Sequence, residues 1–273
     1  MSFSSEQIQK ISKEISGKVN GKTLFDEFSR GRYSTDASVY QIKPLGVILP
    51  KDTNDVLSIM DYSQKNSIPL LARGGGSSQC GQTVGESVVL DYSKHQNKIL
   101  ELNVEEKYVW VEPGVVLDHL NEYLKPYGLW FPVDVSTSSR ATIGGMSANN
   151  SCGSRSLYYG NMVHNVLAIE AILDDGSIFT FDQIEKNYLE KKNNQDRLYK
   201  IIDKFIDVRQ KVASDIKDNW PTTQRRVGGY NIDLIDPNGF NSSNLLVGSE
   251  GTLSLFNKIK LKLSEIPKNK ILG

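Results

Sequence analysis

Three successive glycines constrain this chain more than any other feature of the sequence. The run Gly74–Gly76 follows the apolar stretch Ile68–Ala72 and precedes Ser77 and Ser78. Without Cβ atoms, backbone N–H groups can converge on an anion, and positive φ angles carry little steric cost. We therefore interpret Arg73–Gly81 as a loop after a strand that cradles an anion, with a diphosphate as the expected guest. A tight surface turn is the alternative explanation.

The loop does not match the two best-known phosphate-binding fingerprints. Counting G-x-G-x-x-G from Gly74 puts Gln79 at the third glycine position, and no helical pattern begins there. No Gly-Lys-Ser/Thr sequence follows, as a Walker A loop requires. We expect Ser77, Ser78 and nearby N–H groups to bond phosphate oxygens, while Arg73 either adds charge or holds the loop.

A second segment, residues 132–153, is dense in small residues and short polar side chains. Small residues let a chain lie against a flat ligand, and Ser, Thr and Asn provide both donors and acceptors. A long irregular stretch inside a compact domain is usually functional, although an Ω-loop packed on itself would have the same composition. Together with the glycine loop, this segment predicts a bound nucleotide cofactor.

The composition is that of a globular protein without charge bias. Lys plus Arg and Asp plus Glu both number 32 among the 273 residues, so the formal net charge is zero. This balance does not support a nucleic-acid or membrane-surface role. No apolar run approaches the roughly 18 residues of a membrane span. Residues 1–19 lack a signal-peptide core, and their isoleucine spacing predicts an amphipathic helix.

Cysteine usage points to a reducing compartment. Only Cys80 and Cys152 are present. An iron–sulfur cluster usually needs four thiolates, and no zinc-type spacing of Cys and His occurs, so we expect no metal site in this chain. Without an export signal we expect reduced thiols and a cytoplasmic protein. Any electron relay beyond the cofactor must then lie elsewhere.

The hydrophobic patterning predicts an α+β chain of two α/β lobes. The smaller lobe contains a βαβ unit, and the larger lobe is a mostly antiparallel sheet flanked by helices. The expected strands are 46–50, 68–72, 87–91, 107–112, 166–173, 177–181, 245–247 and 253–263. The expected helices are 52–64, 115–124 and 189–216. We divide the chain into an N-terminal helical segment (1–36), the two lobes (37–95 and 96–266) and the start of a linker (267–273).

Three motifs, in order and spacing, resemble one family of flavoproteins. Arg73–Ser77, Thr142–Gly153 and Gly248–Leu253 are similar to the FAD-linked oxidases of the vanillyl-alcohol-oxidase type, which share a PCMH-type FAD-binding domain. This family includes the FAD subunit of glycolate oxidase, D-lactate dehydrogenases and D-2-hydroxyglutarate dehydrogenases. Tyr33–Tyr40 is similar to the same family, so the resemblance covers about residues 31–263.

The resemblance implies the FAD-binding domain of an oxidoreductase that acts on CH–OH donors. Its substrate would be a 2-hydroxy acid, oxidised to the 2-oxo acid by hydride transfer to flavin. Cys152–Met162 and Arg225–Asn231 resemble the FAD module of large bacterial fusion flavoproteins that also carry iron–sulfur modules. In that family a cap domain follows and supplies catalytic histidines and metal ligands, and this chain stops where the cap would begin.

The partners implied by this resemblance are the missing cap domain or a partner subunit, together with an iron–sulfur electron acceptor. Through such partners the protein would sit at the periphery of the inner membrane. Two alternatives stay open. One is a noncatalytic FAD-binding or electron-transfer subunit, and the other is an NADPH-dependent nucleotide-sugar reductase on the same scaffold.

The resemblance also implies which residues contact FAD. They are Arg73, Gly74, Gly75, Gly76, Ser77, Ser78, Gln82, Pro132, Asp134, Ser136, Ser139, Thr142, Gly144, Gly145, Ser147, Asn149, Gly153, Ile169, Glu250 and Gly251. Some relatives attach FAD covalently through a histidine of the first loop, where this chain has Gly76 and Ser77. Noncovalent FAD is therefore expected. For Glu250 we favour a structural role over a catalytic one.

Catalytic residues are not assigned by the sequence, and three candidates remain. Arg225 and Arg226 would suit a bidentate clamp on a substrate carboxylate, or they are a solvated pair before a Gly-Gly turn. His164 follows the second FAD motif closely. For His95 and His119 a solvated or core position is the better interpretation.

Overall fold

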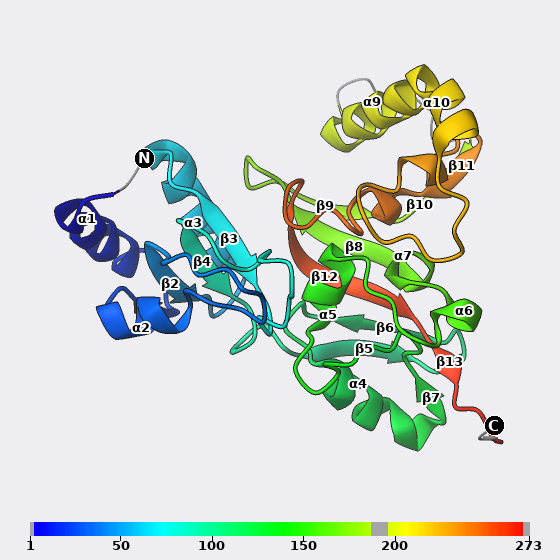
Figure 1. The fold of residues 1–273 in the computed structure, drawn as a ribbon, viewed down its shortest axis with the longest axis horizontal. Coiled ribbons are helices and arrows are strands. Elements are labelled where there is room, and N and C mark those ends of the chain that lie inside the picture. Colours follow the sequence, from blue (N-terminus) through cyan, green and yellow to red (C-terminus); the bar gives the residue numbers. More distant parts are fainter. Residues whose placement is uncertain (1–2, 187–195, 270–273) are drawn as a thin grey trace.

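The first sheet has the spatial order β1-β2-β4-β3 in the computed structural model, which describes residues 3–186 and 196–269 (Figure 1). Its strands are β1 (Lys22–Leu24), β2 (Gly46–Leu49), β3 (Leu70–Arg73) and β4 (Val88–Asp91). Helix α3 (Thr53–Asn66) connects β2 to β3, and both strands run parallel to β4, which lies between them. The predicted βαβ unit is confirmed, and β3 is left at one edge of the sheet.

The N-terminal helix packs on this sheet as its spacing predicts. Helix α1 (Ser5–Ser16) begins at Ser4, whose side chain accepts a hydrogen bond from the N–H of Gln7. Its three isoleucines are buried in the same apolar cluster as α3, β2 and β4. Strand β1, antiparallel to β2, was not predicted, because three residues are too short to show a periodic pattern. Helix α2 (Glu27–Arg32) follows it.

The second sheet is antiparallel throughout and has the order β5-β6-β12-β8-β9. Its strands are β5 (Ile99–Asn103), β6 (Tyr108–Val111), β8 (Val166–Ile172), β9 (Ile178–Phe181) and β12 (Leu255–Lys262). The strands expected at 166–173 and 177–181 are present as β8 and β9, and a turn with Gly176 at φ +81° joins them in a hairpin. The mixed architecture of two lobes therefore confirms the predicted fold class.

One strand expected in the larger lobe is absent. Residues 245–247 do not form a strand; η3 (Ser242–Leu245) and a turn take their place. The N–H groups of Leu246 and Val247 both donate to the carbonyl of Ser243, so local bonds replace a ladder. A short buried apolar run does not distinguish these outcomes.

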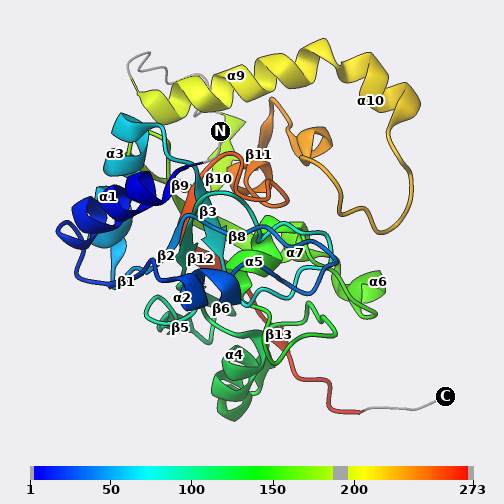
Figure 2. The same cartoon turned by 60° about the vertical axis from the view of Figure 1, so that its left-hand side comes forward.

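The predicted helix 189–216 is present as α9 (Arg197–Lys211) and α10 (Ala213–Asn219), and residues 187–195 lie outside the described part. In both views α9 and α10 lie at the periphery of the molecule (Figures 1 and 2).

Shorter elements complete the larger lobe. They are α4 (Leu117–Leu124), η1 (Lys125–Tyr127), β7 (Leu129–Trp130), α5 (Ile143–Ala148), α6 (Ser156–Tyr159), α7 (Met162–Asn165), β10 (Gln183–Glu185), η2 (Ile232–Leu234), β11 (Gly239–Asn241) and β13 (Ser264–Glu265). Within residues 3–186 and 196–269, no helix has the length and apolarity needed to cross a bilayer.

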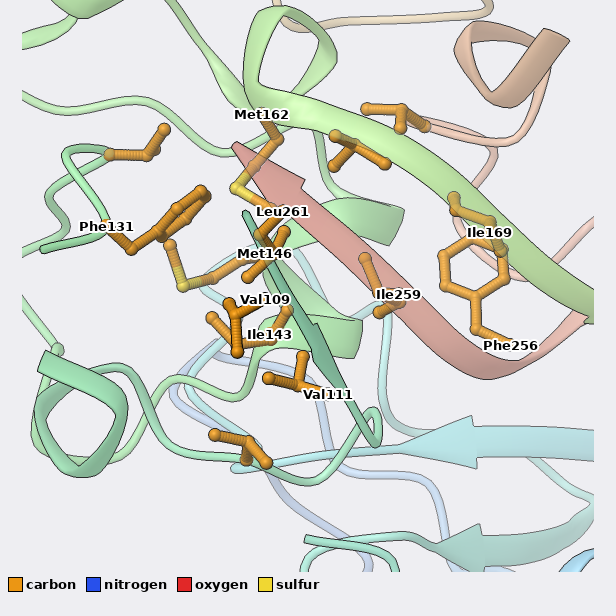
Figure 3. Close-up of a cluster of buried hydrophobic side chains, with 14 of the residues drawn as sticks. Val109, Val111, Phe131, Ile143, Met146, Met162, Ile169, Phe256, Ile259 and Leu261 are labelled. Atoms are coloured by element: carbon orange, nitrogen blue, oxygen red, sulfur yellow. The ribbon is translucent and has the colours of Figure 1, made fainter. Parts of the chain in front are cut away.

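Helix α5 is anchored by the core of the larger lobe. Its Ile143 and Met146 are buried beside Val109 of β6 and Ile259 of β12 (Figure 3). Burying one such side chain contributes about 1.5–3 kcal/mol. Because these residues take the inward face, the small residues between them remain free to face a ligand.

We expect Asp55→Ala to destabilise the smaller lobe. The buried carboxylate accepts hydrogen bonds from the N–H groups of Asn20 (2.7 Å), Gly21 (2.8 Å) and Lys51 (2.7 Å). Its removal leaves three donors unpaired, which should lower the free energy of unfolding by about 2–4 kcal/mol in urea titrations. Asp61→Ala, at an exposed position of the same helix, is the control and should cost about 0.5 kcal/mol or less. Equal losses in the two variants would contradict this account.

Candidate functional site

A cavity of about 590 Å³ lies between the two lobes. Its wall contains β3 and the glycine loop of the smaller lobe, and segments 135–152 and 250–256 of the larger one. β3 is the edge strand of its sheet, and α5 and the start of β12 also line the cavity. The volume is in the range of small-molecule and cofactor sites.

The glycine loop lies directly against residues 140–142. A Cβ atom at Gly74 would be 2.0 Å from Oγ1 of Thr142, and one at Gly75 would be 2.2 Å from the carbonyl oxygen of Arg140. Of the three glycines Gly74, Gly75 and Gly76, the last alone has a positive φ, +64°. The first two glycines are therefore needed for close approach of two loops from different lobes, and the third for the turn.

Arg73 holds the loop from its base. Its guanidinium donates to the carbonyl oxygens of Thr35 (2.8 Å), Thr83 (3.1 Å) and Tyr33 (3.3 Å), and lies 5.2 Å from the centre of the Tyr33 ring. The Tyr33 hydroxyl in turn donates to Oδ2 of buried Asp91 at 2.6 Å. Of the two roles open to Arg73, these contacts support holding the loop.

Most residues expected to contact the cofactor lie together in the cavity wall. They are Arg73, Gly74, Gly75, Gly76, Ser77, Ser78, Gln82, Ser136, Thr142, Gly144, Gly145, Asn149, Glu250 and Gly251. Three separate stretches of the sequence, residues 73–82, 136–149 and 250–251, therefore face one space.

The remaining expected contacts lie outside this wall. They are Pro132, Asp134, Ser139, Ser147, Gly153 and Ile169. Asp134 accepts hydrogen bonds from Ser154 and from the N–H of Arg155. The buried Ser147 donates to the carbonyl of Ile143. Ile169 belongs to the core of the larger lobe (Figure 3).

Sequence reasoning missed one side of the cavity, which we call the inner wall: Leu70, Ala72, Tyr92, Ser254 and Leu255. All but Ser254 belong to the apolar cluster of the smaller lobe or pack against it. These residues carry no glycine-rich or polar signature. A strand that faces a cavity has the same sequence pattern as one that faces a core, so no signal was available to find them.

The closing motif Gly248–Leu253 docks on the end of α5. The N–H of Gly248 donates to the carbonyl of Ser147 (2.9 Å), and the N–H of Glu250 to that of Ala148 (3.0 Å). Glu250 itself has φ +52°, an uncommon angle for a residue with a side chain. The backbone of this motif thus fixes the end of α5 that borders the cavity.

The three catalytic candidates do not line the cavity. Arg225 donates to the carbonyl of Gly153 at 3.0 Å. Arg226 pairs with Asp233 at 2.6 Å, and its charge together with burial lowers the pKa of His164 below the ordinary 6.5. Nδ1 of His164 accepts the N–H of Asn161 at 3.0 Å.

The sequence is similar to a protein family and to several characterised proteins. The sequence profile described as FAD binding domain matches residues 44–182. The D-2-hydroxyglutarate dehydrogenase of Haemophilus influenzae is 37% identical over 252 residues, which cover 88% of this chain and 24% of that protein. Glycolate oxidase subunit GlcD of Bacillus subtilis is 30% identical, over 96% of this chain and 47% of that protein. The chain spans about a quarter of the length of the first relative.

Solved structures show the same fold. An alkyldihydroxyacetonephosphate synthase superposes with a TM-score of 0.67 at 17% identity, over 96% of this chain and 41% of that one. 6-Hydroxy-D-nicotine oxidase from Arthrobacter nicotinovorans superposes with a TM-score of 0.61 at 13% identity, over 92% and 43%. Both chains extend well beyond the shared region.

We expect Gly75→Ala to open the contact between the two loops. Its Cβ atom would meet the carbonyl oxygen of Arg140, a backbone atom that gives way only if a loop moves. The cost should be about 1–3 kcal/mol of unfolding free energy. Gly31→Ala is the control, because a Cβ there meets nothing within 4 Å. Thermal unfolding of both variants checks the prediction, and a Gly75→Ala protein as stable as the control would refute it.

The lowered pKa of His164 predicts a pH dependence of stability. Below about pH 6.5 His164 takes up a proton in the unfolded chain but stays neutral in the folded chain. The contribution of His164 to the free energy of unfolding therefore falls as the pH drops toward its lower pKa in the folded state. His164→Gln keeps an acceptor for the Asn161 N–H and removes the titration. In urea titrations, stability should fall less for the variant than for the wild type between about pH 7.5 and 5.5, a range that spans the ordinary pKa of histidine. Parallel pH profiles would exclude this role.

Proposed function

The chain belongs to the FAD binding domain family, and from that premise we propose that it holds FAD noncovalently for the oxidation of a 2-hydroxy acid to the 2-oxo acid. One observation carries the proposal. The three motifs that resemble flavin-linked oxidases line a single cavity of about 590 Å³. Its substrate class follows from the relatives named D-2-hydroxyglutarate dehydrogenase and glycolate oxidase subunit.

The residues of the cavity fit FAD. Gly74–Gly76, Ser77 and Ser78 offer backbone and hydroxyl donors for a diphosphate. The apolar surfaces of β3 and β12 offer room for a flat ring, and the hydroxyls of Tyr92 and Ser254 are buried there with no partner among the described residues. The first loop has no histidine, which supports a noncovalent complex.

When bound, FAD supplies a hydride acceptor, and the residues of the chain position it and exclude water. The absence of a Cβ at Gly144 lets α5 pack closely on Pro113, where that atom would be 2.6 Å from the Pro113 Cβ, and both residues line the cavity. The titratable side chains among the described lining residues are Arg73, Cys80, Tyr92, Cys152 and Glu250. The guanidinium of Arg73 already donates hydrogen bonds to carbonyl oxygens. Burial raises the pKa of Tyr92, so its hydroxyl keeps its proton.

Among these residues, Cys80, Cys152 and exposed Glu250 are left as candidates for the base that takes the proton of the substrate hydroxyl. We propose that a cap domain or partner subunit supplies that base and the substrate pocket, and that an iron–sulfur acceptor takes the electrons. The two FAD-binding lobes are assigned to residues 37–95 and 96–266, followed by the start of a linker. We also propose that the protein is cytoplasmic and attaches to the periphery of the inner membrane through such partners.

The test is an absorbance spectrum of the purified chain before and after acid precipitation. We expect a yellow protein that releases free FAD into the supernatant. D-2-hydroxyglutarate, D-lactate or glycolate should bleach the flavin slowly in this chain alone, and rapidly once a cap-bearing chain is added. A colourless protein that leaves the fluorescence of added FAD unquenched would refute the proposal. Rapid bleaching by NADPH would favour a reductase instead.

A further inference from the structure

A segment outside the cavity lies against the glycine loop, and we call it the strap: residues 33–42, between α2 and β2. The N–H of Ile42 donates to the carbonyl of Ser34 at 2.9 Å, and Thr35 pairs with Gln41 in an isolated bridge, so the strap folds back on itself. Residues 33–42 are all described, and none of them lines the cavity. The strap therefore acts on a ligand in the cavity only through the loop.

The strap holds the start of the loop through Arg73. Two of its carbonyl oxygens, those of Thr35 and Tyr33, accept hydrogen bonds from the Arg73 guanidinium at 2.8 and 3.3 Å. A Cβ atom at Gly76 would be 2.5 Å from Nη2 of that guanidinium. The turn at Gly76 therefore packs on a side chain that the strap fixes.

The strap also holds the end of the loop. Oδ2 of Asp36 accepts a hydrogen bond from the Thr83 hydroxyl at 3.0 Å, while Oδ1 accepts the N–H of Ser38 at 2.8 Å. Gly81 has φ +75°, and a Cβ atom there would be 2.6 Å from Cδ2 of Tyr40. Residues 73–80, 82 and 83 line the cavity. One segment thus fixes both ends of this part of the cavity wall.

Anchoring affects binding here because the loop is rich in glycine. Glycine has more backbone freedom to lose than any other residue, so a ligand that had to order a free glycine loop would bind weakly. A loop already held in its bound conformation loses less freedom when a ligand arrives. Among variants of one binding site, affinity differences lie mostly in the dissociation rate. The strap is therefore placed to control how long the loop retains a ligand.

We propose that Asp36 and Tyr40 are positioning residues that hold the loop in the conformation that retains FAD. Asp36 acts through the Thr83 hydroxyl, and Tyr40 acts through the backbone of Gly81. This inference rests on the proposed function, since it requires that the loop binds FAD.

Release of FAD from the purified holoprotein tests the role of Asp36. After dilution, the rise of flavin fluorescence gives the dissociation rate, and calorimetric titration of the FAD-free chain gives Kd and the number of sites. Asp36→Ala should raise the dissociation rate and Kd about tenfold with the number of sites unchanged, whereas loss of the fold would lower the number of sites. Val39→Ala, at a 95% exposed position of the strap, is the control and should bind FAD as the wild type does.

A double-mutant cycle shows whether Asp36 acts through Thr83. Thr83→Val removes the hydroxyl donor and should also speed FAD release. If the two side chains act as one unit, Asp36→Ala combined with Thr83→Val loses about tenfold in affinity, no more than the weaker-binding single variant. Losses that multiply to about a hundredfold, or a wild-type dissociation rate in Asp36→Ala, would overturn the assignment.

Tyr40 offers an independent pair of variants, which decides the question if Asp36→Ala fails to fold. Tyr40→Ala removes the ring that lies on Gly81 and should speed FAD release about tenfold, while Tyr40→Phe keeps the ring and should release FAD at the wild-type rate. Equal release rates in the two variants would refute the role of Tyr40. Failure of the wild type to bind FAD would refute the proposed function, whereas a wild type that binds FAD and variants that release it no faster would refute this inference alone.

Discussion

The cavity depends on two loops from different lobes that approach each other more closely than a Cβ atom at Gly74 or Gly75 would allow. Gly74 and Gly75 lie so close to residues 140–142 that any Cβ atom would overlap the opposite loop. A second contact joins the lobes at the start of β12, where Leu255 packs on the apolar cluster of the smaller lobe and Oγ1 of Thr53 donates to Oδ1 of Asn257 at 2.7 Å. The glycine contact and the β12 contact together fix the distance between the sheets, and the cavity lies between them.

Irregular loops can form such a wall only if their polar backbone is satisfied. Buried Asn150, at φ +49°, serves this purpose beside α5: its Oδ1 accepts the N–H of Val163 at 3.0 Å. Nδ2 of buried Asn231 donates to the carbonyl of Val247 at 2.7 Å. These amides hold the loops around the closing motif in one conformation, so the small residues facing the cavity are positioned before any ligand arrives.

What the sequence predicted well is what local chemistry determines. The glycine loop, the βαβ unit and the neighbouring strands expected at 166–173 and 177–181 depend on residues close in sequence, and all are present. The strand expected at 245–247 failed because burial alone does not choose between a ladder and local bonds. The inner wall stayed hidden for a related reason. Leu70 and Ala72 look like ordinary strand residues, and only the order β1-β2-β4-β3 leaves their backbone groups at a free edge.

The same wall shows why binding and folding should be coupled in this protein. The unpaired hydroxyls of Tyr92 and Ser254 destabilise the ligand-free state. The backbone donors and acceptors at the free edge of β3 also have no partner strand. A ligand that pairs them binds only the folded chain, so it raises the free energy of unfolding by RT ln(1 + [L]/Kd). Under the proposed function, FAD fills the cavity between the two lobes, so its binding joins the lobes in the folded state.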